Sequence, residues 1–155
     1  MSRKATFQKS VPKAIPLLVS KFAASDASSG PNPLLLRAYI ALDTLHRGKA
    51  TRGLFTALGQ HLVVAECLCA AGYEKDKLRP LREAHAALVR VDWDARSTNE
   101  LKAAGEDYEA LRTALHLYEV QLRVAPRSEV RLAQLAMMRM IGSPKAASED
   151  QPAAA

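Results

Sequence analysis

The feature that most constrains the fold is an 18-residue run without proline, LFTALGQHLVVAECLCAA, from Leu54 to Ala71. At 100° per residue, its apolar side chains cover one broad face and most of the opposite side. A helix with apolar groups nearly all round is buried on more than one side. The run would be about 27 Å long, but His61 and Glu66 argue against a membrane span. We therefore expect a central core helix with the other helices packed around it.

The composition favours an all-α fold. Hydrophobic residues make up 48% of the 155-residue chain, which permits one hydrophobic core. Aromatic residues are only 5%, and no stretch alternates between apolar and polar residues as a strand would. We predict a single small helical bundle of four to five helices over residues 32–142. Short connections should make neighbouring helices mostly antiparallel.

Capping and stop residues divide this bundle into elements. The predicted helices are 33–46, 54–71, 77–96, 105–126 and 128–141, with a polar loop at 97–105. Asn32, Thr51 and Asp76 are the expected N-caps of the first three helices. Gly48, Gly72, Pro126 and Gly142 are the expected stops. Leu81, Ala84, Leu88 and Val91 form the buried stripe of the third helix, and Trp93 lies off it near Arg82 and Arg90.

The two ends of the chain are predicted to be disordered tails, at 1–31 and 143–155. Pro12 and Pro16 break any long helix in the first, and DASSGPNP has the composition of a linker. The net charge of the chain is +6, made up of +4 over residues 1–31, +3 over residues 32–141 and −1 over residues 142–155. The basic residues of the first tail are Arg3, Lys4, Lys9, Lys13 and Lys21. This charge favours nucleic acid or an anionic surface as a partner, and a merely solvated tail is the alternative.

A helix-turn-helix could use either of two short connections, 47–50 or 72–76. The first would direct Arg47, Lys49 and Arg52 toward phosphate, and the second would direct Lys75, Lys77, Arg79 and Arg82. The second cluster is the better candidate because it opens a helix after a glycine turn. The neighbouring acids and Pro80 weaken it as a recognition helix. The alternative is that these basic residues only make the start of the helix soluble.

Histidines supply the remaining candidate sites. His61 lies on the apolar face of the central helix, where a hydrogen-bonded core histidine is more common than a ligand. His116 and Glu119 are three residues apart and could share a metal, although Arg112 and Arg123 beside them favour an ion-pair surface. The chain has no nucleophile elbow, P-loop, dinucleotide-binding or zinc-protease motif. We therefore expect a protein that is not an enzyme and that uses no cofactor or metal.

The cysteines and the ends of the chain bear on location. Cys67 and Cys69 would point about 200° apart on a helix, so they cannot bridge each other. Two unbridged thiols fit a reducing cytoplasm. The apolar stretch IPLLV is too short for a signal peptide, and no segment is predicted to be transmembrane.

The last predicted helix suggests a second class of function. Met137, Met138 and Met140 suit an adaptable apolar surface for a protein partner or for self-association. The alternative is that they pack in the hydrophobic core. We thus keep two functions open. One is a nucleic-acid-associated regulator, and the other is a helical protein-interaction module.

Two resemblances add to these readings. The stretch ALHLYEVQLRVAP resembles the second helix of a tetratricopeptide repeat through Ala114, Tyr118 and Pro126. Over 43–141, the order LDTLHRG, QHLVVAECLCAAGY and GEDYEALRTAL resembles short helical proteins of bacterial plasmids and prophages, often labelled Fis-family transcriptional regulators. That resemblance implies a bacterial, cytoplasmic accessory protein of a mobile genetic element. A Fis protein ends in a helix-turn-helix, and the segment 137–155 lacks this pattern.

Overall fold

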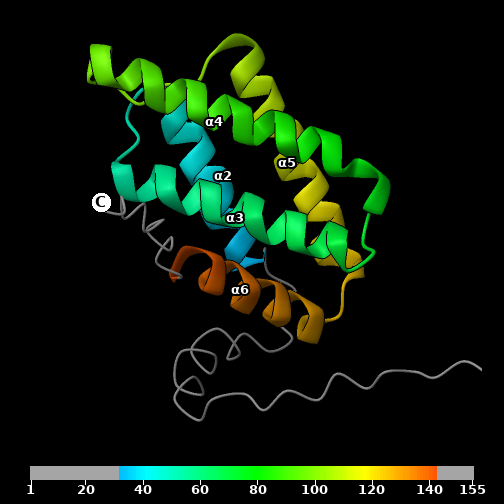
Figure 1. Ribbon diagram of the computed structural model, residues 1–155. Coiled ribbons are helices and arrows are strands. Elements are labelled where there is room, and N and C mark those ends of the chain that lie inside the picture. The colour runs from blue at the N-terminus through cyan, green and yellow to red at the C-terminus, as the bar shows by residue number, and fades with distance from the viewer. Residues whose placement is uncertain (1–31, 143–155) are drawn as a thin grey trace, which may run out of the picture. The chain divides into compact units, whose positions relative to one another are not determined.

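A computed structural model of the chain describes residues 32–142, which form a helical bundle (Figure 1). Its α-helices are α2 (Pro33–His46), α3 (Arg52–Ala70), α4 (Leu78–Thr98), α5 (Gly105–Val124) and α6 (Arg127–Gly142), and a short 3-10 helix, η1 (Lys75–Lys77), precedes α4. Residues 32–142 contain no strand. The predicted all-α fold of four to five helices is therefore confirmed.

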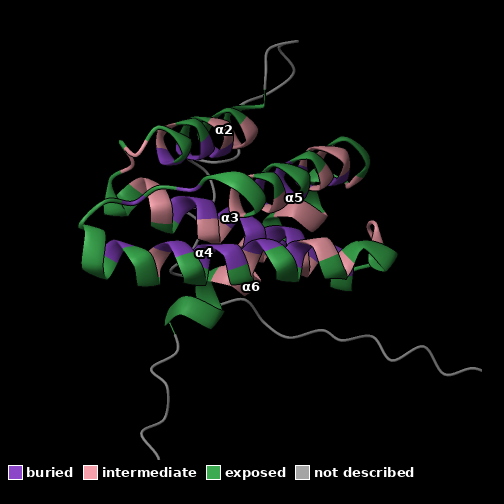
Figure 2. Cartoon of the chain, turned by 90° about the horizontal axis from the view of Figure 1, so that it is seen from above, coloured by how far each residue is buried: buried purple, intermediate pink, exposed green. Residues whose placement is uncertain are grey.

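The central helix is α3, which contacts each of the other four α-helices. In Figure 1, α4 and α6 lie on opposite sides of α3, and α2 and α5 cross behind it. Leu58, Leu62, Ala65 and Leu68 of α3 have no solvent exposure. Figure 2 shows buried residues concentrated on the inward sides of α3 and α4. The prediction that the other helices pack around this run is confirmed.

By length and composition alone, α3 is apolar enough to cross a membrane, with a mean hydropathy of 1.4. The core helix of a folded domain meets the same criterion. Four helices contact α3, and Leu58, Leu62, Ala65 and Leu68 have no solvent exposure. Burial within the bundle accounts for the apolar residues on this face of α3.

Two predicted N-caps are present in the structure. The Asn32 side chain accepts a hydrogen bond from the Leu34 N–H at 3.0 Å, and Thr51 Oγ1 accepts one from the Leu54 N–H at 3.2 Å. Each bond satisfies a backbone donor that has no partner within the helix. The first helix begins and ends at the predicted residues, and the second begins two residues earlier than predicted.

The predicted start of the third helix is wrong in one detail. Asp76 does not cap it, because Glu74 adopts a left-handed φ of 56° and a 3-10 turn follows it. The Lys77 N–H donates to the Glu74 carbonyl at 2.9 Å within this turn. Asp76 therefore lies inside η1, and α4 begins at Leu78 without a side-chain cap.

The connection between α4 and α5 is shorter and less polar than predicted. α4 continues to Thr98 and ends where Asn99 adopts a left-handed φ of 57°. In the loop that follows, Leu101 and Ala103 are buried. The Ala103 N–H donates to the Leu45 carbonyl at 3.1 Å. This loop is therefore part of the core and ties the end of α2 to the start of α5.

Candidate functional site

The basic cluster predicted at the third helix lies on η1 and the first turns of α4. Lys75, Lys77, Arg79 and Arg82 are all exposed. Arg79 Nε lies 2.9 Å from Glu83 Oε1. The other three form no ion pair with any residue in the range 32–142. The structure thus brings the four predicted side chains together at one end of α4.

Neither connection forms the helix-turn-helix that the sequence suggested. In that motif two helices cross steeply, whereas α3 and α4 run antiparallel and side by side in both views (Figures 1 and 2). The other connection, 47–50, leads into α3, which cannot enter a DNA groove because other helices cover it. Arg47 pairs with Asp43 at 3.0 Å, and Arg52 pairs with Asp92.

The other candidate nucleic-acid residues are those of the basic tail. Arg3, Lys4, Lys9, Lys13 and Lys21 lie outside the described residues. Their role stays a prediction from charge and composition.

The structure adds a surface that the sequence reading did not assign, which we name the α4 outer face. It comprises six exposed residues spaced three and four apart, namely Arg79, Arg82, Ala86, Val89, Trp93 and Arg96. Val89 and Trp93 are 67% and 68% exposed. The opposite side of α4 carries the predicted buried stripe, which is confirmed. The spacing of Ala86, Val89 and Trp93 opposite that stripe was the signal that could have found this face.

The charges of the α4 outer face are arranged unevenly. At 100° per residue, its three arginines share one line with Trp93. The carboxylates of Glu83, Asp92 and Asp94 lie about 80° or more from Trp93 around the helix, but Glu83 and Asp92 lie only about 40° from Arg79 and Arg96, their respective partners. Arg96 reaches Asp92 at 3.5 Å, and a hydrogen bond from Arg52 lowers the pKa of Asp92. The Arg96 guanidinium also lies 5.4 Å from the centroid of the Trp93 ring.

His61 is a core residue, which is the more common role that the sequence analysis gave for it. It is 9% exposed, and its ring lies 5.7 Å from the ring of Tyr118, centroid to centroid. Burial, and then the charge of Arg37, lower the pKa of His61. The Tyr118 hydroxyl is buried without a hydrogen-bond partner among the described residues, and burial raises its pKa.

A buried amide holds the end of α3 against α5. Gln121 Nε2 donates to the carbonyls of Ala65 at 3.0 Å and Tyr73 at 3.1 Å, and it lies 3.3 Å from Cys69 Sγ. Cys67 and Cys69 are free thiols, the first half-buried and the second buried, and burial raises the pKa of both. Gln121 therefore has a structural role that no sequence motif predicted.

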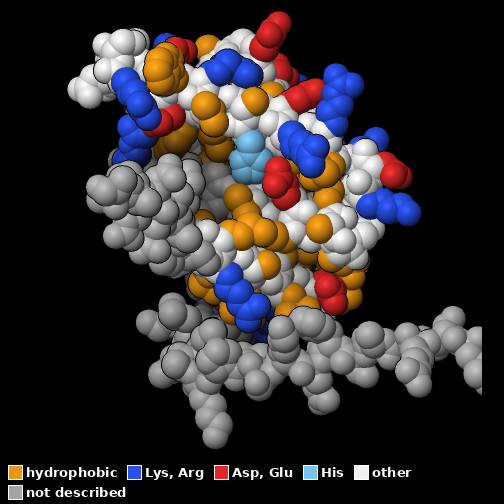
Figure 3. All heavy atoms as spheres, viewed as in Figure 1, with side chains coloured by type: hydrophobic (Ala, Val, Ile, Leu, Met, Phe, Trp, Pro, Cys, Tyr) orange, Lys and Arg blue, Asp and Glu red, His pale blue; other side chains and the backbone are white. Residues whose placement is uncertain are grey.

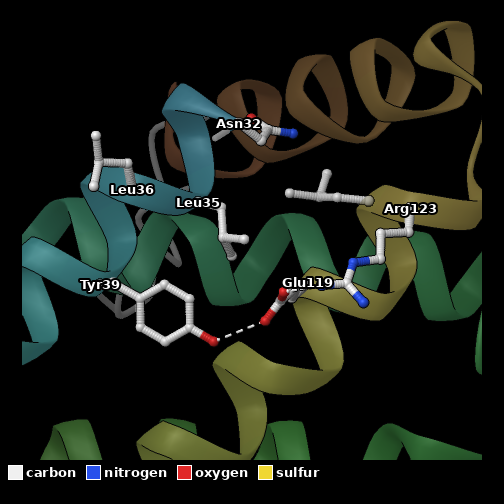
Figure 4. Close-up of a pocket in the computed structure, with 7 residues that line it drawn as sticks. Asn32, Leu35, Leu36, Tyr39, Glu119 and Arg123 are labelled. Carbon is white, nitrogen blue, oxygen red and sulfur yellow. Dashed lines mark hydrogen bonds and ion pairs between the residues drawn. The ribbon is translucent and has the colours of Figure 1, made fainter. Parts of the chain in front are cut away.

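Glu119 lines a shallow groove between α2 and α5 (Figure 4). The groove has a volume of about 440 Å³, and leucines of both helices line it together with Tyr39, Glu119 and Arg123. The Tyr39 hydroxyl donates to Glu119 Oε2 at 3.1 Å, Arg123 pairs with Glu119, and His116 Nδ1 lies 3.8 Å from Oε2. Burial, and then this hydrogen bond, raise the pKa of Tyr39.

This arrangement matches the ion-pair reading of His116 and Glu119. Within residues 32–142, no three His, Cys, Asp or Glu side chains are grouped so that they could hold a metal ion. Glu119 already accepts hydrogen bonds from Tyr39 and Arg123. The cluster therefore fastens α2 to α5.

The last helix, α6, packs mainly on α3 and leaves much apolar surface exposed. Of its residues only Ala133 is buried. Met137 is half-buried, whereas Met138 is 42% and Met140 is 65% exposed. Leu132 and Ile141 are 58% and 57% exposed, and Figure 3 shows apolar side chains at the surface over α3 and α6.

Comparisons with protein-family models, with curated proteins and with solved structures found no match to this chain. The function must therefore be argued from the residues and their geometry.

Proposed function

We propose that this protein is a non-enzymatic accessory or regulatory protein that associates with nucleic acid through the start of α4 and its basic N-terminal tail. The observation that carries the proposal is the line of Arg79, Arg82 and Arg96 on one exposed side of α4. Arg79 and Arg96 pair with carboxylates at the borders of this line, and Arg82 pairs with none among the described residues. Lys75 and Lys77 extend this positive charge at the end where α4 begins.

Such a surface supports binding through phosphates rather than through base sequence. Each phosphate neutralised by Lys or Arg releases counterions, which gives affinity without sequence preference. Base reading by a recognition helix has no support here, because α3 and α4 are antiparallel. A tail of charge +4 adds phosphate contacts of the same kind.

The cellular setting is part of the proposal. Two free thiols suit a reducing cytoplasm. The resemblance of 43–141 to short helical proteins of bacterial plasmids and prophages supports an accessory role on a mobile genetic element.

The test is a salt titration of binding to unrelated single-stranded and duplex oligonucleotides. The slope of log affinity against log salt is about −0.7 per phosphate contact on single strands and about −0.9 on duplex. Replacing Lys75, Lys77, Arg79 and Arg82 together by alanine should flatten the slope by up to about 2.8 units on single strands and about 3.6 units on duplex. Affinity at low salt should fall alike for every sequence.

A control variant that loses the same number of positive charges distinguishes binding at this site from binding through general positive charge. Alanine at Arg37, Lys102, Arg112 and Arg131 removes four exposed basic residues elsewhere, and this variant should keep the steeper slope of the full-length protein. Equal slopes for both quadruple variants, or no binding by the full-length protein at low salt, would refute the proposal.

The exposed apolar surface of α6 favours a second candidate function, a protein-interaction module. Leu132, Leu135 and Met138 share the side of α6 opposite Ala133, and the charges of α6 sum to +2 from three arginines and Glu129. A surface that combines apolar side chains with positive charge fits an acidic, amphipathic helix of a partner protein. A second copy fits less well, because an antiparallel pair centred on Leu135 would bring Arg131 against Arg139.

Binding of designed amphipathic peptides, measured by fluorescence anisotropy, tests this second function. An acidic helix with leucines on one side should bind at least about tenfold more tightly than a basic helix of the same pattern. Replacing Leu132 and Met138 by serine should abolish that preference, and serine at exposed Val124 of α5 should preserve it. Equal binding of the two peptides would exclude this function.

A further inference from the structure

We infer that the α4 outer face binds single-stranded nucleic acid and that Trp93 stacks on one of the bases. This inference rests on the proposed function and names the class of ligand for the same helix. Trp93 is the only tryptophan of the chain. It is 68% exposed, on the side of α4 opposite the buried stripe. A large aromatic side chain held in water on a basic helix has surface available for a ligand.

The contacts of Trp93 suit an unpaired base. The Arg96 guanidinium lies 5.4 Å from the ring centroid, and the high exposure of Trp93 leaves ring surface accessible. Single-strand-binding proteins combine aromatic side chains that stack on bases with arginines that contact phosphates. Val89, one turn away and 67% exposed, extends the apolar surface beside the indole.

The positive charge follows the same line. From Arg79 to Arg96 the α4 outer face is about 26 Å long at 1.5 Å per residue, which is enough to follow a few nucleotides. Arg82 lies between these ends and forms no ion pair with a described residue. A strand that follows this line meets the indole, the Arg82 guanidinium, which has no carboxylate partner among the described residues, and two guanidinium groups that are paired at their edges, Arg79 with Glu83 and Arg96 with Asp92.

The flanking acids favour a single strand over a duplex. A helix in the major groove has phosphates on both of its sides. Glu83 and Asp94 border the α4 outer face on one side, and Asp92 borders it on the other. These carboxylates would face the phosphates of a duplex, whereas a single strand can follow the line between them. Paired bases also offer no free ring face for Trp93.

The tryptophan fluorescence of the full-length protein, excited at a wavelength that tyrosine does not absorb, tests the inference because Trp93 is the only tryptophan. Adding a single-stranded dT oligonucleotide should quench this fluorescence, and the matching duplex should quench it much less. Trp93→Ala should weaken single-strand binding by about 5- to 150-fold, the usual range for one stacked base, and leave the salt slope unchanged. Trp93→Phe retains an aromatic ring and should bind within a few-fold of the unchanged protein.

The matched control is Val89→Ala, which alters the neighbouring exposed apolar residue and should keep the affinity within a few-fold. Circular dichroism of each variant shows that α4 still folds. Single-strand binding with a normal salt slope but no quenching and no effect of Trp93→Ala would overturn the stacking inference and leave the proposed function standing.

Three further results would also overturn the inference. Equal quenching by the duplex would remove the single-strand preference. Quenching by an acidic peptide but not by dT would make the α4 outer face a protein-binding surface. No binding of any nucleic acid at low salt would overturn both this inference and the proposed function.

Discussion

At the scale of single residues, Leu62 is the most direct probe of the core. It lies in the middle of α3 and has no solvent exposure. Leu62→Ala removes buried methyl groups and leaves a cavity, which should lower the free energy of unfolding by about 2–5 kcal/mol. Urea denaturation provides the measurement. The same substitution at Leu132, which is 58% exposed, should cost less than about 0.5 kcal/mol; equal losses would mean that α3 is not central.

His61 should make stability depend on pH. Its folded pKa is lowered by burial and by Arg37, whereas in the unfolded chain it is about 6.5. Between these two pKa values only the unfolded chain binds the proton, so the free energy of unfolding falls as the pH drops below about 6.5. The stabilising contribution of the neutral imidazole is present above that pH.

Replacing His61 by leucine should reduce the loss of stability between about pH 7.5 and 5.5, as followed by urea denaturation. His116→Leu is the matched control, because the His116 side chain is 74% exposed and should preserve the pH dependence of the natural chain. An unchanged loss in the His61 variant would show that the fold does not lower the pKa of this imidazole.

Residues whose role depends on a regular pattern were predictable, and those that depend on distant contacts were not. The stripe of Leu81, Ala84 and Leu88 follows from helical spacing, which is a local property. Gln121 contacts the end of α3, some 50 residues away in sequence, and no local pattern records that contact. Helical spacing places Trp93 off the stripe, but its exposure depends on which side of α4 the neighbouring helices leave uncovered.

At the scale of elements, the N-caps offer a paired test. Thr51 caps α3 through the Leu54 N–H, so Thr51→Ala should lower the free energy of unfolding by about 1 kcal/mol, within a range of about 0.5–2. Asp76 was predicted to cap the next helix but lies within η1 and caps nothing. Asp76→Ala should therefore change stability by less than about 0.5 kcal/mol. A larger loss at Asp76 than at Thr51, measured by thermal or urea denaturation, would reverse these assignments.

The boundaries of most helices were predictable because caps and stops are local signals. Asn32, Thr51 and the residues before Pro126 act within one turn of the helix they limit. The boundaries of α4 differ from the predicted ones by one and two residues, and its predicted cap was wrong. Glu74, just before η1, and Asn99, just after α4, are non-glycine residues that adopt a left-handed φ. That conformation is uncommon for such residues, and sequence alone does not mark it.

At the scale of the whole molecule, the arrangement of α3 and α4 decides which mode of nucleic-acid binding is open. Both helices and the connection between them were predicted, but the antiparallel packing depends on contacts with α5 and α6. This packing removes the helix-turn-helix and leaves one basic, aromatic side of α4 facing outward. The candidate site is therefore a consequence of tertiary packing as much as of the basic residues themselves.

The last prediction concerns which part of the chain folds by itself. All residues of the described core cluster lie between Leu35 and Met137, counting those packed against it. A chain cut to residues 32–142 should therefore unfold in urea with the same midpoint as the full-length protein and with a similar m-value, because m follows the surface exposed on unfolding.

A chain cut to 32–126 lacks α6 and exposes the apolar side of α3 that α6 covers. It should lose several kcal/mol or fail to fold, since apolar burial contributes about 25 cal/mol per Å². A lower midpoint for 32–142 would show that residues 1–31 or 143–155 stabilise the bundle, and an unchanged midpoint for 32–126 would show that α6 is not part of it.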